Sequence, residues 1–227
     1  MRHPKALRAI IGASIIFGMA SAHAAPIFTE TFNNYQSGNF NGGQYQSGLS
    51  VAYGGTFSGW SRTGGNAAHV VDLDNSSNSN FAVMLWRTDV VTLNSAIAGS
   101  NVLGQKYALD FSASAAVYQG GSQQTSSTDE IRVSLLNSNG SVFQSFTYAP
   151  DAWTGTMAFK QAHFEYTGNG TGDLKIQLSS AQQDVYHFAG AVDNLTVAAV
   201  PEPETYAMLL AGLGIMGAVA RRKKQAA

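Results

Sequence analysis

The chain has 227 residues, no cysteine, 12% charged residues and a formal net charge of −1. Residues 25–200 hold six Lys or Arg and twelve Asp or Glu, so this central region alone has a net charge of −6. An acidic region argues against nucleic acid or an anionic membrane surface as its partner. The absence of cysteine excludes disulfides and thiolate metal sites. A region of about 175 residues suffices for one domain with its own hydrophobic core.

The first 24 residues have the features of a secretory signal peptide. Three cations precede an apolar stretch at residues 9–20, and Ala22 and Ala24 form an A-x-A cleavage pattern. We expect signal peptidase to cut after Ala24, which exports the remainder of the chain. An uncleaved N-terminal anchor is the alternative.

Residues 25–199 favour one all-β domain, because charges are few, Gly, Ser, Thr and Asn are abundant, and no dozen residues carry a helical stripe. Asn137-Ser138-Asn139-Gly140 supplies hairpin turn chemistry. We predict an antiparallel β-sandwich, and connections long enough to cross between sheets favour a jelly roll. The predicted strands are 27–32, 68–73, 81–86, 107–117, 130–136, 142–148, 158–166, 174–178 and 191–197.

Two tryptophans are candidates for ligand binding. Trp60 in GTFSGWSRTGG and Trp153 in APDAWTGTM lie in glycine- or proline-flanked segments that read as loops. Exposed rings in loops at the end of a sandwich can stack on sugar faces, and Arg62 could add hydrogen bonds. The alternative is that these rings cover the ends of the core.

Catalytic patterns are not evident. His69, His163 and His187 lie in none of the spaced hydrolase motifs. Asp129 and Glu130 are adjacent, and neighbours in a strand point to opposite faces, which does not suit paired carboxylates in glycoside cleavage. We therefore expect no catalytic residues and no enzyme, although a hydrolase assembled from distant residues remains an alternative.

The C-terminal residues 200–227 read VPEPETYAMLLAGLGIMGAVARRKKQAA. Two prolines keep the start of this segment extended. The sixteen uncharged residues 205–220 would form a helix of about 24 Å, against about 30 Å of bilayer hydrocarbon. Cations beside an apolar span prefer the cytoplasmic side. We predict a short transmembrane helix, with a C-terminal core helix as the alternative. The cations are Arg221, Arg222, Lys223 and Lys224.

This order of Pro201-Glu202-Pro203, apolar helix and basic cluster resembles the PEP-CTERM sorting signal of Gram-negative bacteria that make extracellular polysaccharide. The resemblance implies that exosortase, a membrane-embedded cysteine transpeptidase, removes the tail near the Pro-Glu-Pro element. The inner membrane would then hold the protein only transiently, before the cell surface or the medium receives it.

A second set of segments resembles galactose-binding-like jelly rolls. These are the early FTETF, the central YALDFSASA, the hairpin DEIRVSLLNSNGSVFQSFTY and the closing GAVDNLTV. The resemblance implies a binding or structural fold. It also implies, from some carbohydrate-binding relatives, a structural Ca²⁺ between the first and last strands, where Glu30 and Asp193 match.

The chemistry of these two carboxylates fits either of two interpretations. Asp193 shares parity with Leu195 and Val197, so we expect it to face inward, where a carboxylate needs strong hydrogen bonds or a cation. Ca²⁺ prefers oxygen ligands, and Glu30 would supply a second carboxylate. Backbone N–H groups that cap the carboxylate are the alternative. No other cofactor is expected.

Three hypotheses for function follow. The leading one is an exported, noncatalytic surface or matrix protein, sorted by exosortase, that contributes to a polysaccharide-rich biofilm or floc. The second is a lectin-like module that binds exopolysaccharide. The third is a polysaccharide-active hydrolase.

Overall fold

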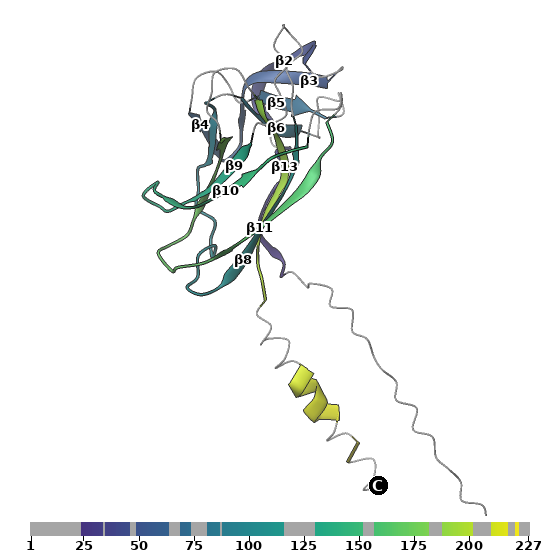
Figure 1. Cartoon of the computed structure of the whole chain (residues 1–227), viewed down its shortest axis with the longest axis vertical. Coiled ribbons are helices and arrows are strands. Elements are labelled where there is room, and N and C mark those ends of the chain that lie inside the picture. Colours follow the sequence, from purple (N-terminus) through teal and green to yellow (C-terminus); the bar gives the residue numbers. More distant parts are fainter. Residues whose placement is uncertain are drawn as a thin grey trace, which may run out of the picture.

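The computed structural model describes residues 24–33, 35–45, 49–63, 69–73, 81–86, 88–115, 130–151, 157–181, 188–201, 210–217 and 221–222. The described residues form two antiparallel sheets that pack face to face (Figure 1). Several expected features lie outside these residues: most of the signal peptide including Ala22, as well as Trp153, Glu202, Pro203, Lys223 and Lys224.

The larger sheet has eight strands in the order β11-β8-β13-β6-β5-β3-β2, and β1 pairs with β13 beside this path. Its strands are β1 (Pro26–Glu30), β2 (Tyr35–Tyr45), β3 (Leu49–Phe57), β5 (His69–Asp72), β6 (Phe81–Trp86), β8 (Lys106–Ser114), β11 (Lys160–Thr167) and β13 (Phe188–Ala199).

The smaller sheet has five strands in the order β10-β9-β12-β7-β4. Its strands are β4 (Trp60–Thr63), β7 (Val90–Leu93), β9 (Ile131–Leu136), β10 (Val142–Tyr148) and β12 (Lys175–Ser180).

The chain crosses repeatedly between the two sheets. From β6 to β9 each strand lies in the opposite sheet from its predecessor, and the same holds from β10 to β13. Such crossing connections are those of a jelly roll. The predicted all-β antiparallel sandwich is therefore confirmed.

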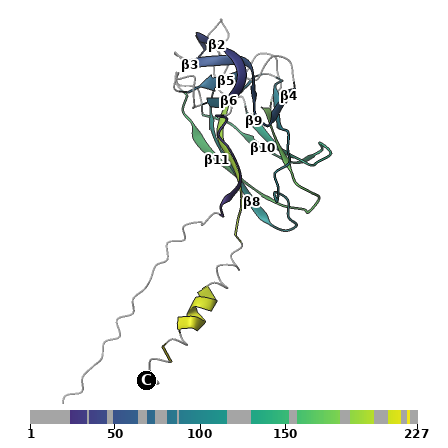
Figure 2. The ribbon, with the colours of Figure 1, turned by 180° about the vertical axis from the view of Figure 1, so that it is seen from behind.

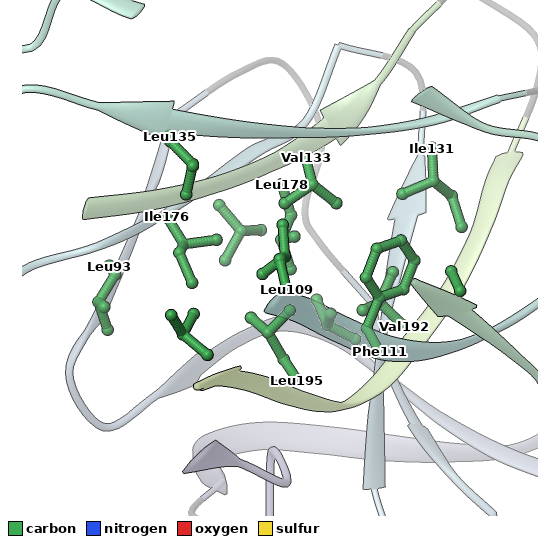
Figure 3. Close-up of a cluster of buried hydrophobic side chains, with 14 of the residues drawn as sticks. Leu93, Leu109, Phe111, Ile131, Val133, Leu135, Ile176, Leu178, Val192 and Leu195 are labelled. Atoms are coloured by element: carbon green, nitrogen blue, oxygen red, sulfur yellow. The ribbon is translucent and has the colours of Figure 1, made fainter. Parts of the chain in front are cut away.

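The core lies between the sheets and is made by alternating residues of both. Ile131, Val133 and Leu135 of β9 face Leu109 and Phe111 of β8 across the interior, and all five are at most 1% exposed (Figure 3). Burying each such side chain contributes about 1.5–3 kcal/mol. Alternate residues of β12 line the same core, namely Ile176 and Leu178.

Four strands were absent from the prediction: β2, β3, β4 and β7. β2 and β3 are rich in Gly and polar residues, so they carry a weak strand signal. Backbone pairing of β3 with β5, and of β2 with β3, places them in the sheet. β4 and β7 have four residues each, and their mutual register puts them in the five-stranded sheet.

The tail follows directly from the last strand. β13 ends at Ala199, and the amide of Val200 still donates to the Lys106 carbonyl at 2.8 Å. A helix is described at 210–217. No described helix is long and apolar enough to cross a membrane. Residues 205–209 and 218–220 of the predicted span lie outside the described part of the chain.

Candidate functional site

The outward face of the five-stranded sheet is built from the residues that alternate with core positions. Ser134 lies between Val133 and Leu135, and Gln177 lies between Ile176 and Leu178. Because successive side chains of a strand point to opposite faces, Ser134 and Gln177 point away from the core.

Strand register aligns these outward residues into two rows, which we call the five-stranded face. Each row takes one residue from each of the five strands, and all neighbours in a row are direct cross-strand partners. The first row is Ser145, Ser134, Gln177, Thr92 and Ser61, and the second is Thr147, Arg132, Ser179, Val90 and Thr63.

Hydrogen bonds fix several of these side chains across the strands. The hydroxyls of Ser134 and Ser145 lie 3.0 Å apart, and Gln177 Nε2 donates to Thr92 Oγ1 at 3.1 Å. The hydroxyl of Ser61 donates to the Thr92 carbonyl at 3.3 Å. The first row is thus a chain of hydrogen-bonding groups held on rigid strands.

The five-stranded face is nearly free of charge. Eight of its ten residues are Ser, Thr or Gln, Val90 is apolar and Arg132 is the single charged residue. The guanidinium of Arg132 donates to the Ala181 carbonyl at 3.4 Å and is half-buried. Ser134 and Ser179 are only 3% and 4% exposed, so small side chains occupy the centre between Arg132 and Gln177.

The expectation of an exposed Trp60 in a loop is wrong. Trp60 begins strand β4, pairs with Leu93 and is only 5% exposed. Its ring lies 5.5 Å from the ring of Phe32 in the core, so it offers no face to a sugar. Arg62, two residues on, pairs with the core residue Val91 and is half-buried.

Glu30 joins the two sheets through Trp60. Glu30 Oε2 accepts a hydrogen bond from Trp60 Nε1 at 2.9 Å, and Oε1 accepts one from the Phe32 amide at 2.7 Å. Phe32 has a φ of 52°, a left-handed conformation that is rare outside glycine. These contacts explain why Trp60 is buried, because its single N–H finds a carboxylate at the edge of the core.

Asp193 is buried, but the predicted parity with Leu195 does not hold. A β-bulge lies between Asp193 and Thr196, and Asn194 within it has a φ of 51°. Val192 and Leu195 both lie in the core, whereas Asp193 pairs with Ser112 on the opposite face from Val192. The extra residue of a bulge shifts the alternation by one position.

Burial, with a smaller contribution from the nearby charge of Glu30, raises the pKa of Asp193 to about 6, although a hydrogen bond from the Asn194 amide acts to lower it. Asp193 Oδ1 accepts that amide at 2.7 Å, and Oδ2 accepts from Asn194 Nδ2 at 3.1 Å. N–H groups therefore cap both carboxylates, as the alternative interpretation expected.

Within the described ranges, no three His, Cys, Asp or Glu residues gather to hold a metal ion. Glu30 and Asp193 nevertheless fit an oxygen-loving cation in two respects. Their charges interact unfavourably, and each carboxylate oxygen keeps a lone pair beyond its N–H contact.

Comparisons with known proteins identify the tail. Residues 199–224 match the PEP-CTERM protein-sorting motif. The chain is therefore a β-sandwich protein that carries a PEP-CTERM sorting signal, as its Pro-Glu-Pro, apolar and basic parts predicted. The motif indicates an exported protein, sorted at the membrane of a Gram-negative bacterium. A comparison with curated proteins finds no match.

Solved structures with a similar arrangement include carbohydrate-binding modules. The CBM22-1 xylan-binding domain of Paenibacillus barcinonensis Xyn10C is 13% identical with a TM-score of 0.46, covering 79% of this chain and 97% of that domain. The TmCBM61 module, solved with β-1,4-galactotriose, is 19% identical with a TM-score of 0.41, covering 62% and 88%. A family 35 module from Clostridium thermocellum is 15% identical with a TM-score of 0.36, covering 77% and 98%.

The five-stranded face was not among the sites predicted from the sequence, because only aromatic rings and their neighbours were considered as sugar-binding groups. The signal was present in the alternation itself, since Arg132 and Ser134 interrupt the apolar positions of one strand and Gln177 interrupts another. Alternation within one strand does not give the order of the strands in the sheet. That order brings residues that are distant in sequence, such as Ser61 and Ser179, into two rows.

Proposed function

We propose that the protein is an exported, noncatalytic surface protein that binds a hydroxyl-rich polysaccharide through the five-stranded face. The observation that carries the proposal is the pair of aligned rows, in which nine of ten residues are uncharged and eight bear hydroxyl or amide groups. We further propose that the bound polymer is the exopolysaccharide of a biofilm or floc.

The chemistry of the face suits such a ligand. Ser and Thr hydroxyls and the Gln amide each donate and accept, so they can pair with sugar hydroxyls in either role. Arg132 adds a planar group that can donate several hydrogen bonds at once. Cross-strand contacts already hold Gln177, Thr92, Ser134 and Ser145, which reduces the conformational entropy lost on binding.

Retention on extracted exopolysaccharide and on a glycan array tests this role. Arg132→Ala and Gln177→Ala should each lower the affinity about tenfold, the value of roughly 1.4 kcal/mol of lost hydrogen bonding. Gln161→Ala is the matched control, because Gln161 Nε2 also donates to a hydroxyl, Ser112 Oγ at 2.8 Å, on the eight-stranded sheet.

Equal losses in all three variants, or none, would contradict the assignment of the face. Release of reducing ends from the polymer by the unmodified protein would instead support the hydrolase alternative. A protein that binds no glycan on the array would leave a purely structural matrix role.

The tail, in our proposal, holds the exported protein at the inner membrane until exosortase cuts near Pro201. The described part of the helix presents Leu210, Leu213, Ile215 and Met216, all more than half exposed, so these side chains need an apolar environment that water does not supply. Pro201 lies immediately after Val200, whose amide pairs with the Lys106 carbonyl.

Replacing Pro201, Glu202 and Pro203 with alanine should preserve membrane insertion and block processing. Replacing the four cations at 221–224 with Ser should weaken the cytoplasmic end instead. Intact mass and fractionation in hosts with and without exosortase distinguish the two failures. If residues 205–227 remain on protein at the surface or in the medium, the tail is an ordinary anchor.

We also propose that Glu30 and Asp193 bind a structural Ca²⁺ between the first and last strands. A bound cation would offset the repulsion between the two carboxylates. Because a ligand that binds only the folded state stabilises it by mass action, the melting temperature should rise with free Ca²⁺. An unchanged melting temperature in excess EDTA would exclude a structural Ca²⁺ at these two carboxylates.

A further inference from the structure

Exposed apolar side chains gather at the end of the sandwich from which the tail leaves. Among the described residues of the two sheets and their loops, the large apolar side chains that are exposed are Ile27, Val102, Leu103 and Val142, at 39%, 57%, 76% and 57%. Ile27 adjoins Pro26, which pairs with Ala198 near the end of β13. Val142 follows a hairpin turn whose Asn137 contacts Thr171 in the loop after β11.

The most exposed of these residues, Val102 and Leu103, lie on a loop that is tightly held. Asn101, only 4% exposed, donates through Nδ2 to the Gly172 carbonyl at 2.8 Å and accepts from the Asn169 amide at 2.7 Å. The Tyr107 hydroxyl accepts from the Val102 amide at 3.0 Å and donates to the Gly99 carbonyl at 2.6 Å.

Close backbone packing completes this support. A Cβ at Gly168 would lie 2.2 Å from the Val102 carbonyl oxygen, so only glycine permits the approach. The loop therefore cannot easily turn its two apolar side chains inward. Their exposure is a property of the folded domain.

The tail leaves directly beside this loop. The Val200 amide donates to the Lys106 carbonyl, and Gln105 Nε2 donates to the Val200 carbonyl at 2.9 Å. Only residues 201–204 separate Val200 from the apolar segment at 205–220, and four extended residues reach at most about 14 Å. Figures 1 and 2 show from opposite sides that β13 runs to this end of the sandwich.

We propose that Val102 and Leu103 insert into the interfacial region of the phospholipid bilayer while the tail is anchored, so that this end of the sandwich rests on the membrane. The proposal depends on the tail insertion proposed above. Two apolar side chains alone would bind lipid weakly, but the short tether gives them a high effective concentration at the surface. The exposed Lys106 beside Val200 adds attraction to anionic headgroups.

This contact would have a consequence for sorting. A domain that rests on the bilayer through a rigid loop holds Pro201 at a constant depth and orientation. The segment that exosortase must reach would then be presented at the lipid surface.

The chain has no cysteine, so single-cysteine labelling reports one position at a time. The full chain, reconstituted into phosphatidylethanolamine–phosphatidylglycerol vesicles, would carry an environment-sensitive fluorophore on Leu103→Cys, Ala158→Cys or Leu213→Cys. Ala158 is an exposed control near the opposite end, where its amide N–H donates to Ser114 Oγ at the end of β8. Leu213 lies in the tail helix and reports tail insertion separately.

We expect blue-shifted emission, and quenching by lipids that carry a shallow quencher, at positions 103 and 213 but not at 158. A label at Ile27→Cys, at the same end of the sandwich, should also report lipid, and the double substitution Val102→Ser, Leu103→Ser should abolish that signal. The melting temperature should stay unchanged, because both replaced side chains are exposed.

A water-exposed label at 103 together with a lipid-exposed label at 213 would overturn the loop contact and leave tail insertion standing. Water-exposed labels at both positions would overturn both proposals. A lipid signal at 158 equal to that at 103 would show nonspecific adsorption of the domain and would also overturn the contact.

Discussion

The two outward faces of the sandwich differ in charge. The five-stranded face bears Arg132 and no carboxylate among its ten residues. The outward face of the eight-stranded sheet bears a 2.6 Å contact between His163 Nδ1 and Asp110 Oδ1, with Glu165 Oε1 3.8 Å from Nε2 of the same ring. Asp193 lies on this sheet as well.

The difference shows that the carboxylates of this acidic domain lie outside the five-stranded face. Residues 25–200 have a net charge of −6, yet the two rows of the five-stranded face hold none of the carboxylates. A face without carboxylates does not repel a polymer that itself carries acidic groups, and it desolvates at lower cost than an ionic face. The five-stranded face is therefore the better candidate for binding a polysaccharide.

The largest effect should come from Trp60, whose role is structural and serves neither face. Trp60→Ala should lower the free energy of unfolding by about 3–5 kcal/mol, because it removes a buried ring and leaves Glu30 Oε2 without its indole donor. Urea denaturation measures the change. Trp60→Phe is the control, since it keeps one aromatic ring but loses the N–H and part of the ring area. If Trp60→Ala abolished glycan binding at full stability, the ring would belong to the ligand site after all.

Asp193 provides the next largest effect. Its pKa is raised from 3.8 to about 6, so the folded state favours the protonated form, and stability should fall as pH rises from about 4 to about 6. In excess EDTA, Asp193→Asn should remove this dependence and raise the melting temperature at pH 7.

Added Ca²⁺ should reverse the order of the two melting temperatures at pH 7, because the carboxylate of Asp193 binds the ion more tightly than the neutral amide of Asn does. Thermal denaturation at several pH values, with EDTA and with Ca²⁺, measures both effects. A melting temperature of the unmodified protein that rises between pH 4 and pH 6 in EDTA would be incompatible with a buried carboxylate in this position.

The His163 contacts on the outward face of the eight-stranded sheet should contribute little to the free energy of unfolding. His163→Ala removes contacts to Asp110 and Glu165 whose side chains are 32% and 54% exposed, and such exposed pairs contribute about 0–1 kcal/mol. Chemical denaturation should therefore place this variant within about 1 kcal/mol of the unmodified protein, with unchanged retention on polysaccharide. A loss of retention would move the ligand site to the eight-stranded sheet.

The smallest effect should be that of salt on binding to an uncharged polysaccharide. Because Arg132 is the single charge on the five-stranded face, screening has little to act on. We expect retention to change less than about twofold between low and physiological ionic strength. Loss of binding with added salt would indicate that charged residues on the eight-stranded sheet, or acidic groups on the polymer, dominate the interaction.

The sequence by itself determined the features that depend on contiguous residues. The sorting motif was predictable because Pro-Glu-Pro, an apolar run and a basic cluster are recognised in linear order. The inward faces of β9 and β12 were predictable because alternation with a period of two follows from strand geometry. The all-β class followed from the same local patterns.

The tertiary structure alone decided how distant residues combine. Trp60 looked like a loop residue because glycines flank it, but pairing with Leu93 and the bond to Glu30 place it in the core. One bulge residue reversed the expected parity of Asp193. The five-stranded face exists only because five strands from distant parts of the chain align in one register, and burial of the opposite, apolar face specifies that register.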